Sequence, residues 1–191
     1  MKPTIEYQGA SIDAETFLQR TLRAANALQA AGVCEGEVIA LLMRNSPQLL
    51  ELMLAARWIG ALWCPINWHF RSGELQFILS DCGAKVLVVD AGLQQSLAGL
   101  DLGSIRVFVA GNESERSGDP GGLRSWARFR DSVPPLDSAA CLPRGAMFYT
   151  SGTTGRPKGI RRAAASAEQV AQGQQVLRHV LGFEPGMRAL L

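Results

Sequence analysis

The sequence predicts an α/β protein with a doubly wound, mostly parallel β-sheet and flanking helices. Three observations support this class. Short, unbroken apolar runs recur along the chain, as in strands buried on both faces. Helical patterns lie between these runs, and Gly, Pro, Asn or Ser residues separate the two kinds of segment. The alternation favours parallel pairing, in which each helix connects two strands.

The expected elements follow in chain order. The expected strands are residues 38–43, 62–66, 86–89 and 105–109, and a short strand that ends at Tyr149. The expected helices are residues 13–31, 47–59, 72–81, 94–100 (a weak pattern) and 164–181. Gly32 and Gly60 end the first two helices. Residues Asn45 and Ser46 can cap the second helix, and Ser72 can cap the third.

Residues 111–145 differ in composition from the rest of the chain, because Gly, Pro, Ser and charged residues dominate there. The segment could mark a domain boundary. A long surface connection within one domain is the favoured interpretation, because Trp126 and Phe129 suggest that the segment docks locally.

Composition excludes several classes of function. The net charge of +2 gives no reason to expect a nucleic-acid partner. The four cysteines are scattered and the chain has two histidines, so we expect reduced thiols and no metal site. His69, which lies between aromatic residues, is expected to be a partly buried packing residue, and a role in lining a ligand channel is the less favoured alternative. We expect no signal peptide or transmembrane segment, and a cytoplasmic location.

One segment stands out chemically: Tyr149-Thr150-Ser151-Gly152-Thr153-Thr154-Gly155-Arg156-Pro157-Lys158-Gly159. Its glycines let backbone N–H groups approach phosphate oxygens without a Cβ in the way. Its Ser and Thr hydroxyls add donors, and Lys158 and Arg156 add charge-assisted ones. Arg144, Arg161 and Arg162 lie near it in sequence, although a solvated basic surface is the favoured interpretation of Arg161 and Arg162. The segment predicts a loop that binds a polyphosphate.

Two other motifs fail on spacing. A Walker-type phosphate loop needs Gly-Lys followed by Ser or Thr, but here Pro157 precedes Lys158 and Gly159 follows it. A nucleophile elbow centred on Ser151 needs a glycine at position 149, which is a tyrosine. A kinase of the Walker type and a serine hydrolase are therefore disfavoured.

The segment 149–159 resembles the ATP-phosphate signature of the adenylate-forming (AMP-binding) superfamily, which includes acyl-CoA synthetases, luciferases and peptide-synthetase adenylation domains. Weaker similarities precede it in the family's order, at residues 36–46, 60–67 and 74–88. One local departure is Arg161-Arg162-Ala163, where many relatives have Thr-His-Arg. The resemblance covers nearly the whole chain from about residue 12, and acyl-CoA synthetases, that is carboxylate–CoA ligases, resemble it most.

The resemblance implies ATP-dependent activation of a fatty or aryl carboxylic acid to an acyl-adenylate, with release of pyrophosphate, followed by transfer to coenzyme A. ATP, Mg²⁺ and coenzyme A are the implied cofactors and co-substrates, and an oligomer is possible. The resemblance assigns the ATP phosphates to Thr150, Ser151, Gly152, Thr153, Thr154, Gly155, Lys158 and Gly159.

Residues 1–191 would be the N-terminal portion of the large AMP-binding domain, without the C-terminal lid domain. No catalytic or metal-binding residue is expected in this span, because the family's acidic Mg²⁺ residues and its adenylation lysine would lie downstream. Two alternatives remain open: a truncated, catalytically silent nucleotide-binding or interaction fragment, and an adenylation domain of the peptide-synthetase type.

Overall fold

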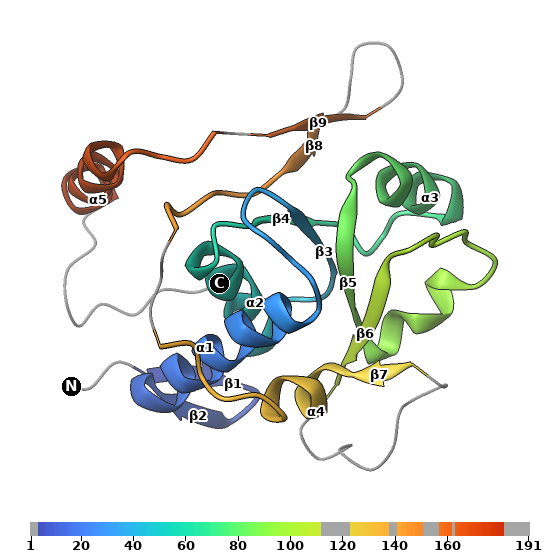
Figure 1. The fold of residues 1–191 in the computed structure, drawn as a ribbon, viewed down its shortest axis with the longest axis horizontal. Helices are drawn as coiled ribbons and strands as arrows, with labels where there is room; N and C mark the ends of the chain where they lie inside the picture. The colour runs from blue at the N-terminus through green and yellow to red at the C-terminus, as the bar shows by residue number, and fades with distance from the viewer. Residues whose placement is uncertain (1–3, 112–122, 138–140, 151–156, 162, 182–191) are drawn as a thin grey trace.

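The structure is a computed structural model that describes residues 4–111, 123–137, 141–150, 157–161 and 163–181 (Figure 1). Its centre is a five-stranded parallel sheet with the strand order β4-β3-β5-β6-β7. These strands are β3 (Val38–Leu42), β4 (Leu62–Pro65), β5 (Ala84–Asp90), β6 (Arg106–Ala110) and β7 (Arg124–Ser125). The chain places β4 on one side of β3 and the later strands on the other, which confirms the predicted doubly wound sheet.

Helices cover both faces of the sheet. They are α1 (Ala14–Ala30), α2 (Pro47–Trp58), α3 (Ser72–Asp81) and α4 (Trp126–Asp131), with a 3₁₀ helix, η1 (Ala91–Leu97), in place of the weak helix expected near residue 97. In β3, Ile39 and Leu41 pack with α1, α2 and α4, whereas Val38, Ala40 and Leu42 pack with α3 and η1. Because successive side chains of a strand point to opposite faces, a continuous apolar run is what a sheet covered on both faces requires.

The helix boundaries follow from capping chemistry. Ser46 is the N-cap of α2 and accepts a hydrogen bond from the Leu49 N–H at 3.2 Å, as predicted. The expected cap of α3 was wrong by one residue: Arg71 is the N-cap, and its N–H donates to Glu74 Oε2 at 3.0 Å. Ser72 is therefore the first residue of that helix.

The sequence patterns missed an N-terminal hairpin, formed by β1 (Thr4–Tyr7) and β2 (Ala10–Asp13). Its turn consists of Gln8 and Gly9, which both have positive φ angles. That is the geometry of a two-residue hairpin turn, but the usual signal has Asn or Asp in place of Gln8. The strands are four residues long and mostly exposed, so they lack a clear apolar pattern.

Part of the region of residues 111–145 docks on the sheet as expected. Trp126 in α4 is fully buried and lies edge-on to Phe108 at 5.6 Å, while Phe129 stacks on Phe108 at 4.8 Å. Arg130 is also buried, and its Nη1 donates to both carboxylate oxygens of Glu51 in α2 at 3.0 and 3.1 Å. These contacts favour a surface connection over a domain boundary.

A second hairpin and a helix complete the described chain. The hairpin pairs β8 (Phe148–Thr150) with β9 (Lys158–Ile160) in antiparallel register, and α5 (Ala167–Leu181) follows. The sequence predicted a strand here that ends at Tyr149, one residue before the end of β8, and it did not predict β9. It placed the start of α5 three residues too early, at residue 164. The hairpin lies near β4 and α3, and α5 lies on the opposite side of the molecule from α3 (Figure 1).

Candidate functional site

The β8–β9 hairpin carries the segment that the sequence singles out. Thr150 and Lys158 form the cross-strand pair next to the connection between the two strands, so the first and the last charged or hydroxyl-bearing residues of the predicted site face each other. Five predicted site residues, Ser151, Gly152, Thr153, Thr154 and Gly155, lie outside the described residues. The structure therefore describes Thr150, Lys158 and Gly159 of the predicted set.

Lys158 is exposed, and no hydrogen bond or ion pair of its ammonium group is found within the part of the chain that the structure describes. Lys85, by contrast, lies 3.4 Å from Glu37 in an ion pair. An ammonium group that no carboxylate neutralises is suited to bind an anionic ligand. Lys158 meets that condition at the end of the hairpin.

Gly159 has a packing role that the sequence did not indicate. A Cβ at this position would lie 2.6 Å from Met147 Cε and about 3 Å from the Tyr149 ring atoms Cζ (3.0 Å) and Oη (3.1 Å). Tyr149 is the cross-strand partner of Gly159, so its ring crosses the backbone of β9 at the glycine. Space for Tyr149 is therefore one physical reason for a glycine here.

The hairpin is joined to the edge of the sheet. Ala146 forms a parallel bridge with Trp63 of β4, and the Met147 N–H donates to the Trp63 carbonyl at 2.8 Å. Met147 is buried in the core cluster on the α3 face of the sheet. The chain thus passes directly from the apolar core into the candidate site.

Tyr149 connects β8 to the C-terminal end of α3. Its hydroxyl donates to Asp81 Oδ2 at 2.6 Å, and its ring lies edge-on to Phe77 at 6.4 Å. Burial raises the pKa of Tyr149 well above its usual value, and the hydrogen bond to Asp81 raises it further. The phenol is therefore a hydrogen-bond donor throughout the neutral range.

Arg161, which follows β9 directly, contacts the same end of α3. Its Nη2 donates to the Cys82 carbonyl at 2.7 Å. The expectation that Arg161 belongs to a solvated basic surface is therefore incomplete, because its guanidinium has a backbone partner. Arg162 lies outside the described residues.

The thiols behave as expected from their scattered positions. Cys64 and Cys82 are buried, Cys141 is half-buried and Cys34 is exposed, and all four are free. The neighbouring Cys82 thiol and burial raise the pKa of Cys64, and the neighbouring Cys64 thiol lowers the pKa of Cys82. Within the described residues no group of three or more His, Cys, Asp or Glu side chains could hold a metal ion.

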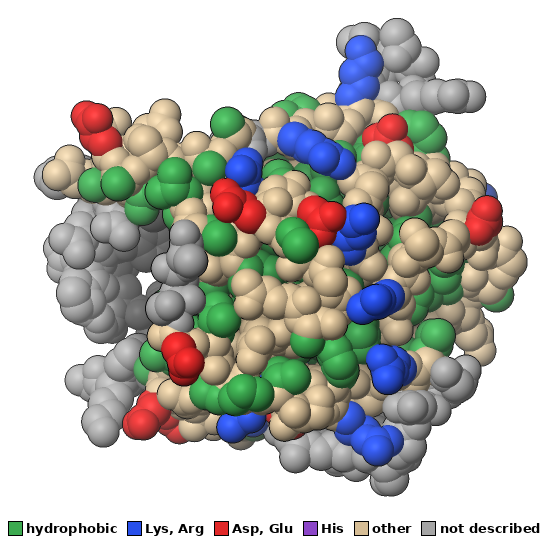
Figure 2. Space-filling view, in the orientation of Figure 1, with side chains coloured by type: hydrophobic (Ala, Val, Ile, Leu, Met, Phe, Trp, Pro, Cys, Tyr) green, Lys and Arg blue, Asp and Glu red, His purple; other side chains and the backbone are tan. Residues whose placement is uncertain are grey.

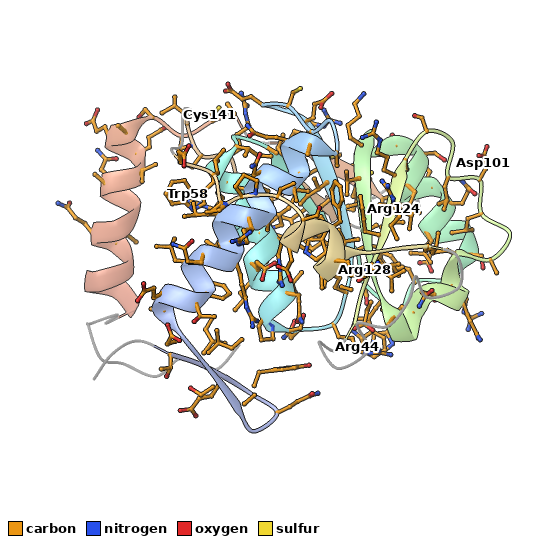
Figure 3. All side chains as sticks on the ribbon, turned by 60° about the horizontal axis from the view of Figure 1, so that its bottom comes forward. Arg44, Trp58, Asp101, Arg124, Arg128 and Cys141 are labelled. Atoms are coloured by element: carbon orange, nitrogen blue, oxygen red, sulfur yellow. The ribbon has the colours of Figure 1, made fainter. Side chains whose placement is uncertain are left out.

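The prediction for His69 was wrong. The side chain is exposed and stacks on Trp68, with 3.5 Å between ring centroids. The Arg44 guanidinium also lies over the Trp68 ring, at 5.0 Å from its centroid. Figure 3 shows Arg44 at the opposite end of the molecule from Cys141. Flanking aromatic residues suggested burial, but a short turn after β4 leaves Trp68 and His69 exposed, while Phe70 is half-buried against the core cluster on the α3 face.

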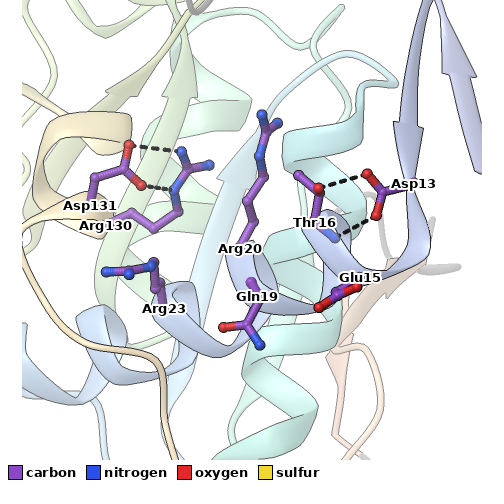
Figure 4. Close-up of a pocket in the computed structure, with 8 residues that line it drawn as sticks. All are labelled: Asp13, Glu15, Thr16, Gln19, Arg20, Arg23, Arg130 and Asp131. Carbon is purple, nitrogen blue, oxygen red and sulfur yellow. Dashed lines mark hydrogen bonds and ion pairs between the residues drawn. The ribbon is translucent and has the colours of Figure 1, made fainter.

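The described residues line several pockets outside the hairpin, among them an apolar groove and a polar pocket. An apolar groove of roughly 970 Å³ lies between α2 and α5, with Leu54, Met53 and Val176 among its lining residues. A polar pocket of about 450 Å³ lies beside α1 and α4 (Figure 4). The polar pocket is lined by three arginines, Arg20, Arg23 and Arg130, and three carboxylates, Asp13, Glu15 and Asp131.

Charge is also balanced more widely. Figure 2 shows basic and acidic side chains interspersed over the visible face, without a large patch of one sign. None of the helices described here is long and apolar enough to span a bilayer.

Comparison with known proteins identifies the family. Residues 2–190 match the family model described as AMP-binding enzyme. The chain is 33% identical over 155 residues to a feruloyl-CoA synthase of an Amycolatopsis species, covering 81% of this chain and 29% of the relative. It is also 33% identical over 158 residues to a long-chain-fatty-acid–CoA ligase of Mycobacterium tuberculosis, covering 78% of this chain and 29% of that protein.

Solved structures support the same family assignment. The crystal structure of an anthranilate CoA ligase in complex with anthranoyl-AMP superimposes with a TM-score of 0.73 at 25% identity, covering 85% of this chain and 32% of that one. The five-stranded sheet and its helices thus have the architecture of an AMP-binding enzyme, and the chain belongs to this family. It spans less than a third of the length of each of these three proteins.

Proposed function

We propose that this chain contributes the ATP-phosphate site of an AMP-forming carboxylate–CoA ligase that acts on a fatty or aryl acid in the cytoplasm. We further propose that residues 1–191 correspond to the N-terminal portion of the large domain of such an enzyme. The observation that carries the proposal is the register of the hairpin, because it sets Thr150 opposite an exposed Lys158, which has no carboxylate partner among the described residues, at the ends of a Gly, Ser and Thr segment.

The roles follow from the chemistry of the side chains. Thr150, Ser151, Thr153 and Thr154 offer hydroxyl donors to the β- and γ-phosphates of ATP. Gly152, Gly155 and Gly159 allow backbone N–H groups close to the oxygens, although Gly159 also makes room for Tyr149. Lys158 supplies a charge-assisted contact. Mg²⁺, when bound with ATP, would share the phosphate charge.

In the reaction, the substrate carboxylate attacks the α-phosphorus of ATP, and the bond to the β-phosphate oxygen breaks. The products are an acyl-adenylate and pyrophosphate, and the thiol of coenzyme A then attacks the acyl carbon and displaces AMP. Residues that hold the leaving pyrophosphate act by positioning and by charge stabilisation. Lys158 is a binding residue and not a base, because neighbouring phosphates keep its ammonium protonated.

The test is pyrophosphate release with ATP, Mg²⁺ and a panel of fatty and aryl acids, using this chain and any longer product of the same reading frame. In the active form, Lys158→Ala should lower kcat/KM for ATP by an amount equivalent to roughly 2–4 kcal/mol. Lys85→Ala is the matched control, because this lysine is already paired with Glu37. Unchanged kinetics in Lys158→Ala would remove Lys158 from the mechanism.

Acceptor choice needs a second step in the same assay. Addition of coenzyme A should convert the acyl-adenylate to a thioester if the enzyme is a CoA ligase. Transfer to a carrier-protein pantetheine and not to coenzyme A would favour an adenylation domain of the peptide-synthetase type. Absence of acid-dependent pyrophosphate release from every form would favour a catalytically silent fragment.

A further inference from the structure

The two strands of the hairpin are held by one structural element. Tyr149 on β8 donates to the Asp81 carboxylate at 2.6 Å, and Arg161 after β9 donates to the Cys82 carbonyl at 2.7 Å. Asp81 is the last residue of α3, and Cys82 is its C-cap. We propose that Asp81, Cys82, Tyr149 and Arg161 form a clamp, here called the α3 clamp, that positions the phosphate-binding segment.

The electrostatics of α3 support this assignment. A helix C-terminus carries partial negative charge, so a carboxylate there is unfavourable and a cation is favourable. Asp81 ends α3, and the last turn of the helix contains no basic residue of its own. Arg161 supplies the missing cation from another part of the chain, and Tyr149 supplies a donor to the carboxylate. The helix end is thus completed by the hairpin.

The surrounding backbone leaves room for both contacts. Gly83 follows the C-cap with a φ of +65°, and a Cβ there would lie 3.4 Å from Arg161 Nη2. Gly159 leaves space for the Tyr149 ring, since a Cβ there would approach Tyr149 Oη to 3.1 Å. Phe77 of α3 contacts the same ring edge-on. Each of the two clamp side chains, Arg161 and Tyr149, therefore passes close to a glycine.

Apart from the clamp, the hairpin has little to hold it. Each of its strands has three residues, and Phe148 and Ile160 are 55% and 48% exposed. Its first strand follows the Trp63 bridge, but β9 reaches the body of the protein through Arg161. The clamp therefore fixes the separation and direction of the two ends of the segment that would surround the phosphates. Tyr149 is a positioning residue in this account and does not contact ATP.

The first test measures amide hydrogen exchange by NMR at Phe148–Thr150 and Lys158–Ile160, with the β3 amides as internal reference. Tyr149→Phe and Asp81→Ala should each raise exchange in the hairpin by about three- to tenfold, the scale of one ordinary hydrogen bond. The double variant should show no further increase, because both changes remove the same contact. Asp81→Asn keeps an acceptor oxygen and should restore near-normal exchange.

Tyr7→Phe is the matched control, because it removes the hydroxyl of the chain's other tyrosine, which lies in β1. It should leave hairpin exchange unchanged. For the second arm, Arg161→Met should raise exchange at β9, and Arg161→Lys should restore part of the protection. Additive effects of Tyr149→Phe and Asp81→Ala, or no effect of either, would overturn the clamp.

The second test titrates the same variants with MgATP, and this step rests on the proposed function. Binding that weakens about three- to tenfold in Tyr149→Phe, while Tyr7→Phe binds normally, supports the positioning role. If Lys158→Ala weakens binding and Tyr149→Phe does not, the positioning role is wrong and the proposed function stands. If the unaltered chain does not bind MgATP, the proposed phosphate site of this chain is contradicted, and hydrogen exchange alone decides whether the clamp holds the hairpin.

Discussion

The central sheet and the β8–β9 hairpin are stabilised in different ways. Every residue of β3 is buried, and its side chains enter two apolar cores. Every residue of β9 is exposed, and the hairpin depends on a few polar contacts with α3 and β4. Apolar burial is non-directional and tolerates many sequences, whereas the hairpin needs particular donors and acceptors. The comparison predicts large effects of substitution in the sheet layers and local effects in the hairpin.

The largest effect is expected where charge is buried between the sheet-covering helices. Glu51→Ala leaves the Arg130 guanidinium, which is 2% exposed, with Asp131 but without its α2 partner. The loss should be about 3–5 kcal/mol of unfolding free energy, the cost of breaking a buried ion pair from one side. Urea unfolding measures it. The control is Glu35→Ala, because the exposed ion pair of Glu35 with Arg144 should contribute about 0–1 kcal/mol. Equal losses of unfolding free energy in the two variants would refute the distinction between buried and exposed ion pairs.

A core truncation compares the two regions directly. Leu87→Ala in β5 removes a fully buried side chain and should cost about 2–5 kcal/mol. Phe148→Ala in β8 removes a larger side chain that is 55% exposed, and should change the unfolding free energy by about 0.5 kcal/mol or less. Urea midpoints of both variants would decide the matter. A Phe148→Ala effect as large as that of Leu87→Ala would mean that the hairpin belongs to the cooperative core.

Substitution of Gly60 tests the contact between the central sheet region and the segment that leads into the β8–β9 hairpin. Gly60 has a φ of +66°, and a Cβ there would lie 2.7 Å from Cys141 Cβ, on the segment that leads into β8. Gly60→Ala should cost about 1–3 kcal/mol, because the left-handed conformation is strained for other residues. Gly73→Ala is the control, since nothing lies within 4 Å of its Cβ position in α3. That variant should be neutral or stabilising by about 0.4–1 kcal/mol in thermal unfolding.

The smallest effect is expected at the exposed start of α1. The Thr16 N–H and hydroxyl donate to the Asp13 carboxylate at 2.9 and 2.7 Å, and these bonds hold the pKa of Asp13 below its usual value. The depressed folded-state pKa means that the stabilisation is present above about pH 4 and is lost as the pH falls through the folded-state pKa. The stability difference between the unaltered chain and Asp13→Ala should therefore shrink on acidification. Thermal unfolding of both proteins at several pH values measures this difference. A difference that grows at low pH would contradict the assignment.

The sequence was sufficient for four of the five strands of the sheet, because these strands have a clear apolar pattern, whereas the two-residue strand β7 was not predicted. Continuous apolar runs such as the one at β5 allow few arrangements other than a strand covered on both faces, and Pro47 after two candidate caps, Asn45 and Ser46, marks the start of α2 to within a residue. The short hairpins were missed because three- or four-residue exposed strands have no apolar period. The sequence of β9 is Lys-Gly-Ile, which is as typical of a loop as of a strand.

The site was predictable as a segment but not as an arrangement. The residue types of 149–159 indicate phosphate binding, and that assignment remains a prediction for each residue. The partners Asp81 and Cys82 could not be found from spacing, since they lie far from Tyr149 and Arg161 in the chain. One sequence signal existed: Asp81 is an acidic residue at the end of a helix, where charge alone disfavours it.

The distance in sequence between the two sides of the α3 clamp also bears on the order of folding. The Tyr149–Asp81 contact joins residues 68 positions apart, and the Arg161–Cys82 contact joins residues 79 positions apart. During synthesis α3 emerges and can pack on β3 and β5 well before either donor exists, and long loops close late because their ends must first be brought together. We therefore expect the helix end to remain incomplete until the hairpin arrives, so that the nucleotide segment is among the last parts of the chain to acquire its shape.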